Sequence, residues 1–196
     1  MPVLPEKYKS ILLVPVGPIP NPSIVMAGMV ADGSKLVAKI KDGLEGRGHK
    51  VEVYIDPVAK AFEMMKSMTP EQIQAMQKDS LKNMNKKGAY GNKQTIERLT
   101  TQYDLVICIA NVSSTMRTTQ RLEWAISKGG WDNPWYVNEL PVIFVSFNCP
   151  FHLADVPQIK NYINCYDAHD TSIEHLLRKI AGESEFKGRS TVEIGR

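Results

Sequence analysis

The residues best suited to acid–base chemistry lie together near the C-terminal end of the chain, at Asp167-Ala-His169-Asp170. A carboxylate beside a histidine can orient the imidazole ring and raise its basicity, as a general base requires. The same residues also suit a helix start, because Asp170 or Thr171 could cap a helix expected at Ser172–Ile180. Glu174 would then lie in the first turn, where a negative charge is favourable. We interpret these residues as a cap and assign no catalytic residue.

Two further motifs have a chemistry that their surroundings do not support. Gly28 to Lys35 nearly spells a phosphate-binding loop, but the final Ser34-Lys35 is in reversed order and no strand precedes the glycines directly. Ser113 and Ser114 follow a predicted strand, where ligands of open α/β sheets bind. The Gly-x-Ser-x-Gly sequence of a nucleophile elbow is absent. The sequence therefore predicts neither a nucleotide site nor a nucleophilic serine.

Composition narrows the classes of function that remain possible. The chain has 196 residues and a net charge of +3, with Lys and Arg spread along it, so no nucleic-acid partner is expected. Its cysteines, Cys108, Cys149 and Cys165, sit in or just after apolar runs and are predicted to be buried free thiols. No Cys-x-x-Cys or His-x-x-x-His spacing occurs, so we expect no metal site and no cofactor.

The termini and the apolar runs give no sign of export or of a membrane partner. No apolar run approaches the roughly 20 residues of a membrane-spanning helix. The N-terminus lacks the basic-then-apolar order of a signal peptide. We expect a soluble protein, cytoplasmic if the chain is complete.

The elements that would position these residues alternate between strands and helices. Apolar runs bounded by turn formers predict strands at Ser10–Val16, Val51–Ile55, Tyr103–Ala110, Val142–Val145 and Tyr162–Tyr166. Helical patterns cover Asp32–Gly46, Thr119–Lys128 and Ser172–Ile180. Right-handed crossovers then place helices on both faces of the sheet. The predicted fold class is α/β, a flavodoxin-like, open, mostly parallel sheet of five or six strands in a three-layer sandwich.

The chain reads as one domain, residues 1–196, with a helical excursion at about 58–102. Thr69-Pro-Glu-Gln72 has the residues of a helix start, with Thr as the cap and Gln able to reach back to it. Methionines are frequent in this segment and are typical of core filling. The alternative is a helical flap that packs on a neighbouring domain or subunit.

The most distinctive sequence features occur in residues 141–194. In order, they are Ser146, Pro150-Phe151, Leu153-Ala-Asp-Val-Pro157, Tyr166, Gly182-Glu183 and Gly188-Arg-Ser-Thr-Val-Glu-Ile194. This order resembles the closing part of the C-terminal α/β domain of family 3 glycoside hydrolases. Over residues 8–194 the order of strands and helices fits the same domain.

The resemblance implies a function in carbohydrate metabolism. In that family an N-terminal barrel carries the nucleophile, and this chain has no room for one. Several β-glucosidases of the family supply their acid Glu from this second domain, soon after the equivalent of Asn111-Val-Ser-Ser114. Here Ser114–Gln120 contains no carboxylate, which resembles the β-N-acetylhexosaminidase branch. Retaining hydrolysis needs two carboxyl groups about 5 Å apart, and the sequence offers no such pair.

We therefore expect a non-catalytic or accessory domain of a glycoside hydrolase of the β-N-acetylhexosaminidase or β-glucosidase type, inactive alone. The resemblance implies that it borders a sugar site through Asn111, Ser113 and Asn148. Its expected partner is a barrel catalytic domain or, in a homo-oligomer, a second copy of the chain, either of which would cover an exposed apolar face.

The alternative is a stand-alone flavodoxin-like module that binds a small molecule such as a sugar. Trp131, Trp135 and Tyr136 would then offer stacking faces, although such loop aromatics also serve as packing or interface anchors.

Overall fold

The computed structural model describes residues 2–17, 34–54, 69, 72, 99–112, 122, 136–190 and 192. The chain divides into two compact units, Met1–Tyr54 with Tyr103–Arg196, and Ile55–Gln102. The predicted excursion at about 58–102 lies almost wholly outside the described residues. Within it, Thr69 and Gln72 exchange hydrogen bonds, Thr69 N–H to Gln72 Oε1 at 3.0 Å and Gln72 N–H to Thr69 Oγ1 at 3.4 Å. This reciprocal pair confirms the predicted capping box.

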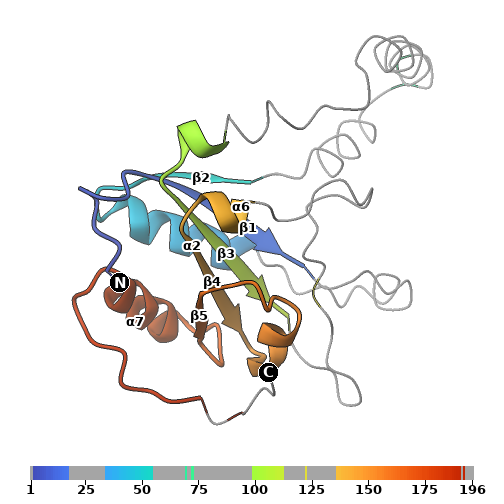
Figure 1. The fold of residues 1–196 in the computed structure, drawn as a ribbon, viewed down its shortest axis with the longest axis vertical. Coiled ribbons are helices and arrows are strands. Elements are labelled where there is room, and N and C mark those ends of the chain that lie inside the picture. Colours follow the sequence, from blue (N-terminus) through green and yellow to red (C-terminus); the bar gives the residue numbers. More distant parts are fainter. Residues whose placement is uncertain are drawn as a thin grey trace. The chain divides into compact units, whose positions relative to one another are not determined.

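The first unit is built on a sheet of five parallel strands (Figure 1). The strands are β1 (Ser10–Val16), β2 (Lys50–Val53), β3 (Leu105–Asn111), β4 (Val142–Phe147) and β5 (Asn161–Asn164), in the order β2-β1-β3-β4-β5. The chain moves outward from β1 to β2 and then returns to build β3, β4 and β5 on the other side of β1. That reversal is the switch point of a doubly wound sheet. The predicted α/β fold is confirmed, and the strand boundaries shift by no more than about two residues.

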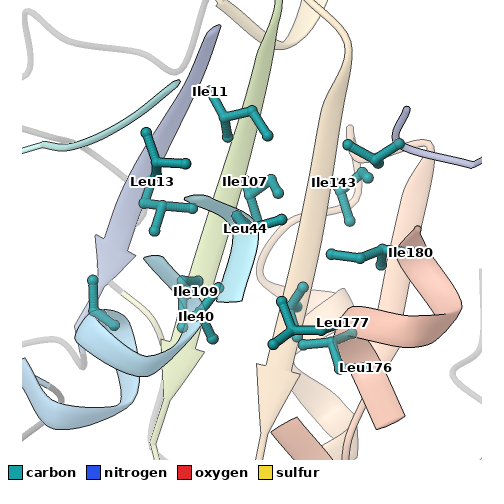
Figure 2. Close-up of a cluster of buried hydrophobic side chains, with 14 of the residues drawn as sticks. Ile11, Leu13, Ile40, Leu44, Ile107, Ile109, Ile143, Leu176, Leu177 and Ile180 are labelled. Atoms are coloured by element: carbon teal, nitrogen blue, oxygen red, sulfur yellow. The ribbon is translucent and has the colours of Figure 1, made fainter. Parts of the chain in front are cut away.

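Two helices, α2 (Ser34–Glu45) and α7 (Asp170–Ile180), pack together on one face of the sheet. Figure 2 shows isoleucines and leucines of β1, β3 and β4 meeting the apolar sides of both helices. The labelled members of this cluster are Ile11, Leu13, Ile40, Leu44, Ile107, Ile109, Ile143, Leu176, Leu177 and Ile180. Apolar residues at helical spacing thus become the inner stripe of each helix.

Each of these helices ends at a glycine with a positive φ, Gly48 at 93° and Gly182 at 80°. After α2, the amides of Gly48 and His49 donate to the carbonyls of Glu45 and Leu44. After α7, the amides of Gly182 and Glu183 donate to Lys179 and Arg178 in the same pattern. This pair of hydrogen bonds closes the last turn and needs a left-handed residue, which explains why both helices stop at glycine.

The start of α7 corrects the sequence interpretation. The helix begins at Asp170 and its N-cap is His169, so neither Asp170 nor Thr171 is the cap. The His169 side chain forms no capping hydrogen bond. The Asp167 carboxylate instead accepts the His169 amide, at 3.0 Å, just before the helix.

The other face of the sheet is buried as well. Leu12, Val14, Val106, Cys108 and Phe144 project to that side in alternation with the residues of Figure 2, and none is more than 5% exposed. Burial on both faces accounts for the continuous apolar runs of β1, β3 and β4. Cys108 and Cys149 are buried free thiols as predicted, and Cys165 is a half-buried one. None of the described helices is long and apolar enough to cross a membrane.

Short elements complete the described part of the chain. α6 (Tyr136–Glu139) precedes β4, and the 3₁₀ helix η1 (Pro150–Ala154) joins β4 to the segment before β5. The predicted helix Thr119–Lys128 and the aromatic loop at Trp131 and Trp135 lie outside the described residues, except for Leu122.

Candidate functional site

The candidate site is the edge of the sheet where the carboxyl ends of β3, β4 and β5 meet. Parallel strands place their carboxyl ends at one edge, and open α/β sheets bind ligands there. β3 ends at Asn111, and Asn148 directly follows β4. Asn148 Nδ2 donates a hydrogen bond of 2.6 Å to Asn111 Oδ1. The structure therefore joins two of the three predicted substrate-binding residues, whereas the third, Ser113, lies outside the described residues.

The turn after β4 holds Asn148 in place. Asn148 has a φ of 64°, a left-handed conformation that Asn adopts more readily than most residues. Ser146 Oγ donates to the carbonyl oxygen of Cys149 at 2.8 Å, bridging the turn from its two ends. Pro150 then starts η1, where its missing amide hydrogen has no consequence. Both Asn111 and Asn148 are half-buried.

The side chain of His152, whose burial the sequence did not predict, lies against this turn. His152 has no exposed surface, and its Nδ1 lies 2.7 Å from Ser146 Oγ. Ser146 Oγ therefore lies within hydrogen-bond distance of both the Cys149 carbonyl oxygen and His152 Nδ1. His152 thus belongs to η1, and its side chain is held in the interior. A Ser six positions before a His is too common a spacing to have revealed it.

Tyr162 and Asn164 extend the polar layer along β5. The Tyr162 ring stacks on Phe144 with centroids 5.6 Å apart and an angle of 8° between planes. Burial raises the pKa of Tyr162 to about 12, an effect that the Ser146 hydroxyl and the Leu153 backbone partly offset. The Asn164 Oδ1 atom is buried and has no hydrogen-bond partner within the described part of the chain. Among the described residues, the polar side chains behind this edge are therefore hydroxyl, amide and imidazole groups.

The residues first considered for acid–base chemistry lie after β5 and serve the helix start. The pKa of Asp167 is lowered by a hydrogen bond from the Ser172 side chain and then by the His169 amide. Asp170 pairs with Lys39 of α2 at 2.5 Å, with both side chains exposed. Asp167 thus stabilises the first turn of α7, where a carboxylate is favoured.

The described residues also bear on a metal site and on a second groove. No group of three or more His, Cys, Asp and Glu side chains among them is placed to hold a metal ion. A groove of ≈ 270 Å³ lies at the opposite edge, against the first residues of β4 and β5, with Glu139 and Lys160 in its lining. It is therefore separate from the asparagine pair.

Comparison with known proteins places this edge in context. No protein-family model matches the chain. It is 40% identical over 96 residues to a β-N-acetylglucosaminidase/β-glucosidase from Cellulomonas fimi. It also superimposes on a β-glucoside phosphorylase, BglX, solved with 2FGlc bound, with a TM-score of 0.63 and 28% identity. A second structure of that phosphorylase gives a TM-score of 0.62 and 27% identity.

These matches cover most or half of this chain but only a part of each relative. The Cellulomonas fimi match spans 48% of this chain and 17% of the relative, and the BglX match spans 98% of this chain and 27% of the phosphorylase. The chain is thus similar in sequence and fold to a part of these enzymes, in line with its resemblance to the C-terminal α/β domain of family 3 glycoside hydrolases.

Proposed function

We propose that this chain is a non-catalytic, accessory domain that supports the catalytic barrel of a family 3 glycoside hydrolase, of the β-N-acetylhexosaminidase or β-glucosidase type. The observation that carries this proposal is the partial match. The chain spans 17% of the Cellulomonas fimi relative, so most of such an enzyme lies elsewhere. A barrel is the proposed partner, and a second copy of the chain in a homo-oligomer is the alternative.

Two described carboxylates, which follow β4 and β5, support a non-catalytic role. Asp155 Oδ2 accepts the Leu122 amide at 3.0 Å, and Asp167 Oδ1 accepts the His169 amide. A retaining glycosidase needs two carboxyl groups facing each other across one sugar, about 5 Å apart. Both acids instead hold backbone groups.

The asparagine pair suits the border of a sugar site. With Asn148 Nδ2 donating to Asn111 Oδ1, the pair keeps Asn148 Oδ1 as an acceptor and the Asn111 amide hydrogens as donors. Sugar hydroxyl groups both donate and accept, so adjacent amides of opposite polarity match them. Ser113, two residues beyond Asn111, is proposed as a third contact.

The test is complementation. A Cellulomonas fimi enzyme that lacks the region matching this chain is assayed with a nitrophenyl β-N-acetylglucosaminide, with and without the purified chain. We expect no turnover by this chain alone and a gain of at least tenfold when the two are mixed. Asn111→Leu should weaken the gain, and Lys41→Ala, at a half-exposed residue of α2 that pairs with Glu45, should leave it unchanged. Turnover by the chain alone, or a mixture no more active than the truncated enzyme, would contradict the proposal.

A stand-alone sugar-binding module is the second candidate, favoured by the position of the amide pair next to the switch point of the sheet. Calorimetric titration with monosaccharides separates the two. A complete binding site should reach a Kd below about 1 mM, or about −4 kcal/mol. One wall of a shared site should bind more weakly than calorimetry measures, because it supplies only part of the contacts.

A further inference from the structure

Two polar side chains of β5 are buried without completing a hydrogen bond. The atoms are Tyr162 Oη and Asn164 Oδ1, and neither has a hydrogen-bond partner within the described part of the chain. Buried polar groups in native proteins are nearly always paired, either with protein atoms or with ordered water. An unpaired group carries the whole cost of its desolvation, so two of them on one short strand need an explanation.

The two side chains lie on the same face of the sheet, on either side of one serine. Tyr162 and Asn164 are two residues apart in β5, so they project to the same side. That side faces away from α2 and α7, because the intervening Ile163 packs against the main core cluster. In the sheet register Asn164 is the partner of Ser146, and Tyr162 is the partner of Phe144, on which its ring stacks. Asn164 and Ser146 are therefore side by side.

The Tyr162 hydroxyl reaches toward the same serine. Burial raises the pKa of Tyr162, and the Ser146 hydroxyl and the Leu153 backbone are close enough to offset part of that rise. Neither of them completes a hydrogen bond with the tyrosine. Ser146 Oγ is itself engaged, at 2.8 Å from the Cys149 carbonyl oxygen and 2.7 Å from His152 Nδ1. The serine is thus a common neighbour of both unpaired atoms and is occupied by other groups.

The two unpaired atoms are complementary to a single water molecule. The carbonyl oxygen of Asn164 can only accept a hydrogen bond, and the hydroxyl of Tyr162 can donate one. A water molecule can accept from the tyrosine while it donates to the asparagine, which satisfies both groups at once. Because both atoms are buried, the site suits a ligand as small as water, and buried waters typically make about three such bonds.

We propose that the chain binds one long-lived internal water molecule, which bridges Tyr162 Oη and Asn164 Oδ1. The water completes the polar layer around Ser146, whose hydroxyl spans the turn that carries Asn148. It therefore connects β5, the edge strand, with the turn after β4. This site does not depend on the proposed accessory role of the chain, so the two can fail separately.

The test counts internal waters in the intact chain by oxygen-17 magnetic relaxation dispersion, which detects long-lived water molecules. Asn164→Leu removes the acceptor, whereas Tyr162→Phe removes the donor and keeps the stack on Phe144. Asn161→Leu is the matched control in the same strand, because the Asn161 amide is exposed and donates directly to the Val142 carbonyl at 3.2 Å.

We expect Asn164→Leu and Tyr162→Phe each to hold one long-lived water fewer than the wild type, and Asn161→Leu to hold the same number. A high-resolution crystal structure of the wild type should place that water within hydrogen-bond distance of both atoms. Equal counts in all four proteins would overturn the proposal, and so would a crystal structure with no water between Tyr162 and Asn164.

Thermal melting at neutral pH is a second test, which remains valid if Asn164→Leu does not fold. If the Tyr162 hydroxyl is bound to water, Tyr162→Phe loses a hydrogen bond and should melt a few degrees below the wild type. If the hydroxyl is buried without a partner, its removal relieves a desolvation cost and raises the melting temperature. A Tyr162→Phe variant that melts at or above the wild-type temperature would therefore contradict the proposal.

Discussion

Asn148 and Asn111 tie the end of β4 to the end of β3 through one side-chain hydrogen bond of 2.6 Å. The two residues lie far apart in sequence and meet because parallel neighbouring strands end at the same edge. The contact is half-buried, and Asn148 reaches it from a left-handed backbone. Asn148 therefore meets two requirements at once: it tolerates a left-handed backbone, and its side chain donates a hydrogen bond to Asn111.

Substitution of Asn148 separates these two requirements. Asn148→Gly and Asn148→Ala both lose the hydrogen bond to Asn111, each at a cost of about 1 kcal/mol. Alanine must also adopt a φ near 64°, so we expect Asn148→Ala to be less stable than Asn148→Gly by roughly 1 kcal/mol. Urea denaturation of the three proteins checks this order. Equal stability of the two variants would mean that the turn relaxes.

Gly43→Ala tests the contact between α2 and α7. An added Cβ would lie 2.3 Å from Leu177 Cδ1, and Leu177 is 3% exposed, so its side chain has little room to move. We expect a loss of about 1–3 kcal/mol from overpacking, although alanine favours the helix itself. Gly188→Ala is the control, since nothing lies within 4 Å of its added Cβ.

A double variant shows whether that loss comes from the contact. If Leu177 is the obstacle, Gly43→Ala should cost much less in a Leu177→Ala background. Additive losses in denaturation midpoints would instead place the effect outside the α2–α7 contact.

The N-terminal segment should contribute to stability through Val3. Its amide donates to the Ile180 carbonyl at 2.6 Å, and its side chain is 1% exposed within the main core cluster. We expect Val3→Ala to lower the free energy of unfolding by about 1–3 kcal/mol through lost burial and a small cavity. Leu4→Ala, at a neighbouring residue that is 44% exposed, should change it by less than about 0.5 kcal/mol. If Val3→Ala and Leu4→Ala lowered the melting temperature equally, the N-terminal segment would not be packed into the core through Val3.

Stability should fall at alkaline pH because two groups are held in their neutral forms. Burial raises the pKa of Cys165 from 9.0 to about 12 and that of Tyr162 from 10.0 to about 12. The folded state then retains protons that the unfolded state releases, so the contribution is complete below pH 9 and declines from there to about pH 12. Denaturation midpoints across this range provide the measurement.

Variants of Tyr162 and Cys165 show which of the two groups causes the loss of stability at alkaline pH. Tyr162→Phe keeps the stack on Phe144 and should flatten the decline above pH 10. Cys165→Ala should flatten the part that begins near pH 9. An unchanged slope in both proteins would assign the alkaline loss to other groups.

Local patterns in the sequence were sufficient for the elements of the sheet. The apolar run at Ser10–Val16 matches β1 residue for residue, because a strand buried on both faces leaves a continuous apolar signal. Glycines mark the ends of α2 and α7, since the left-handed residue that closes each helix is a local need. The start of α7 was misplaced because Asp167, Asp170 and Thr171 are all good capping residues, and local preference does not choose among them.

The candidate edge was predicted in outline. Asn111 and Asn148 were picked from the family resemblance and the rule that ligands gather at strand ends, but the hydrogen bond between them depends on how β3 and β4 align. The role of His152 had no local signal, because its burial depends on η1 folding back over Ser146. Tyr166 stood in the sequence as a strand residue, whereas its backbone has a positive φ of 55°, between the pairing of Cys165 with Ser146 on one side and the α7 cap on the other.

Periodicity and turn chemistry act over a few residues, so the order of elements and the fold class follow directly from the chain. The contacts that make an edge into a site join residues from different strands, and those depend on register and on which helices cover which face. Asn111 and Asn148 illustrate the difference: each residue type is plain in the sequence, but the sheet alone brings their strand ends to one edge.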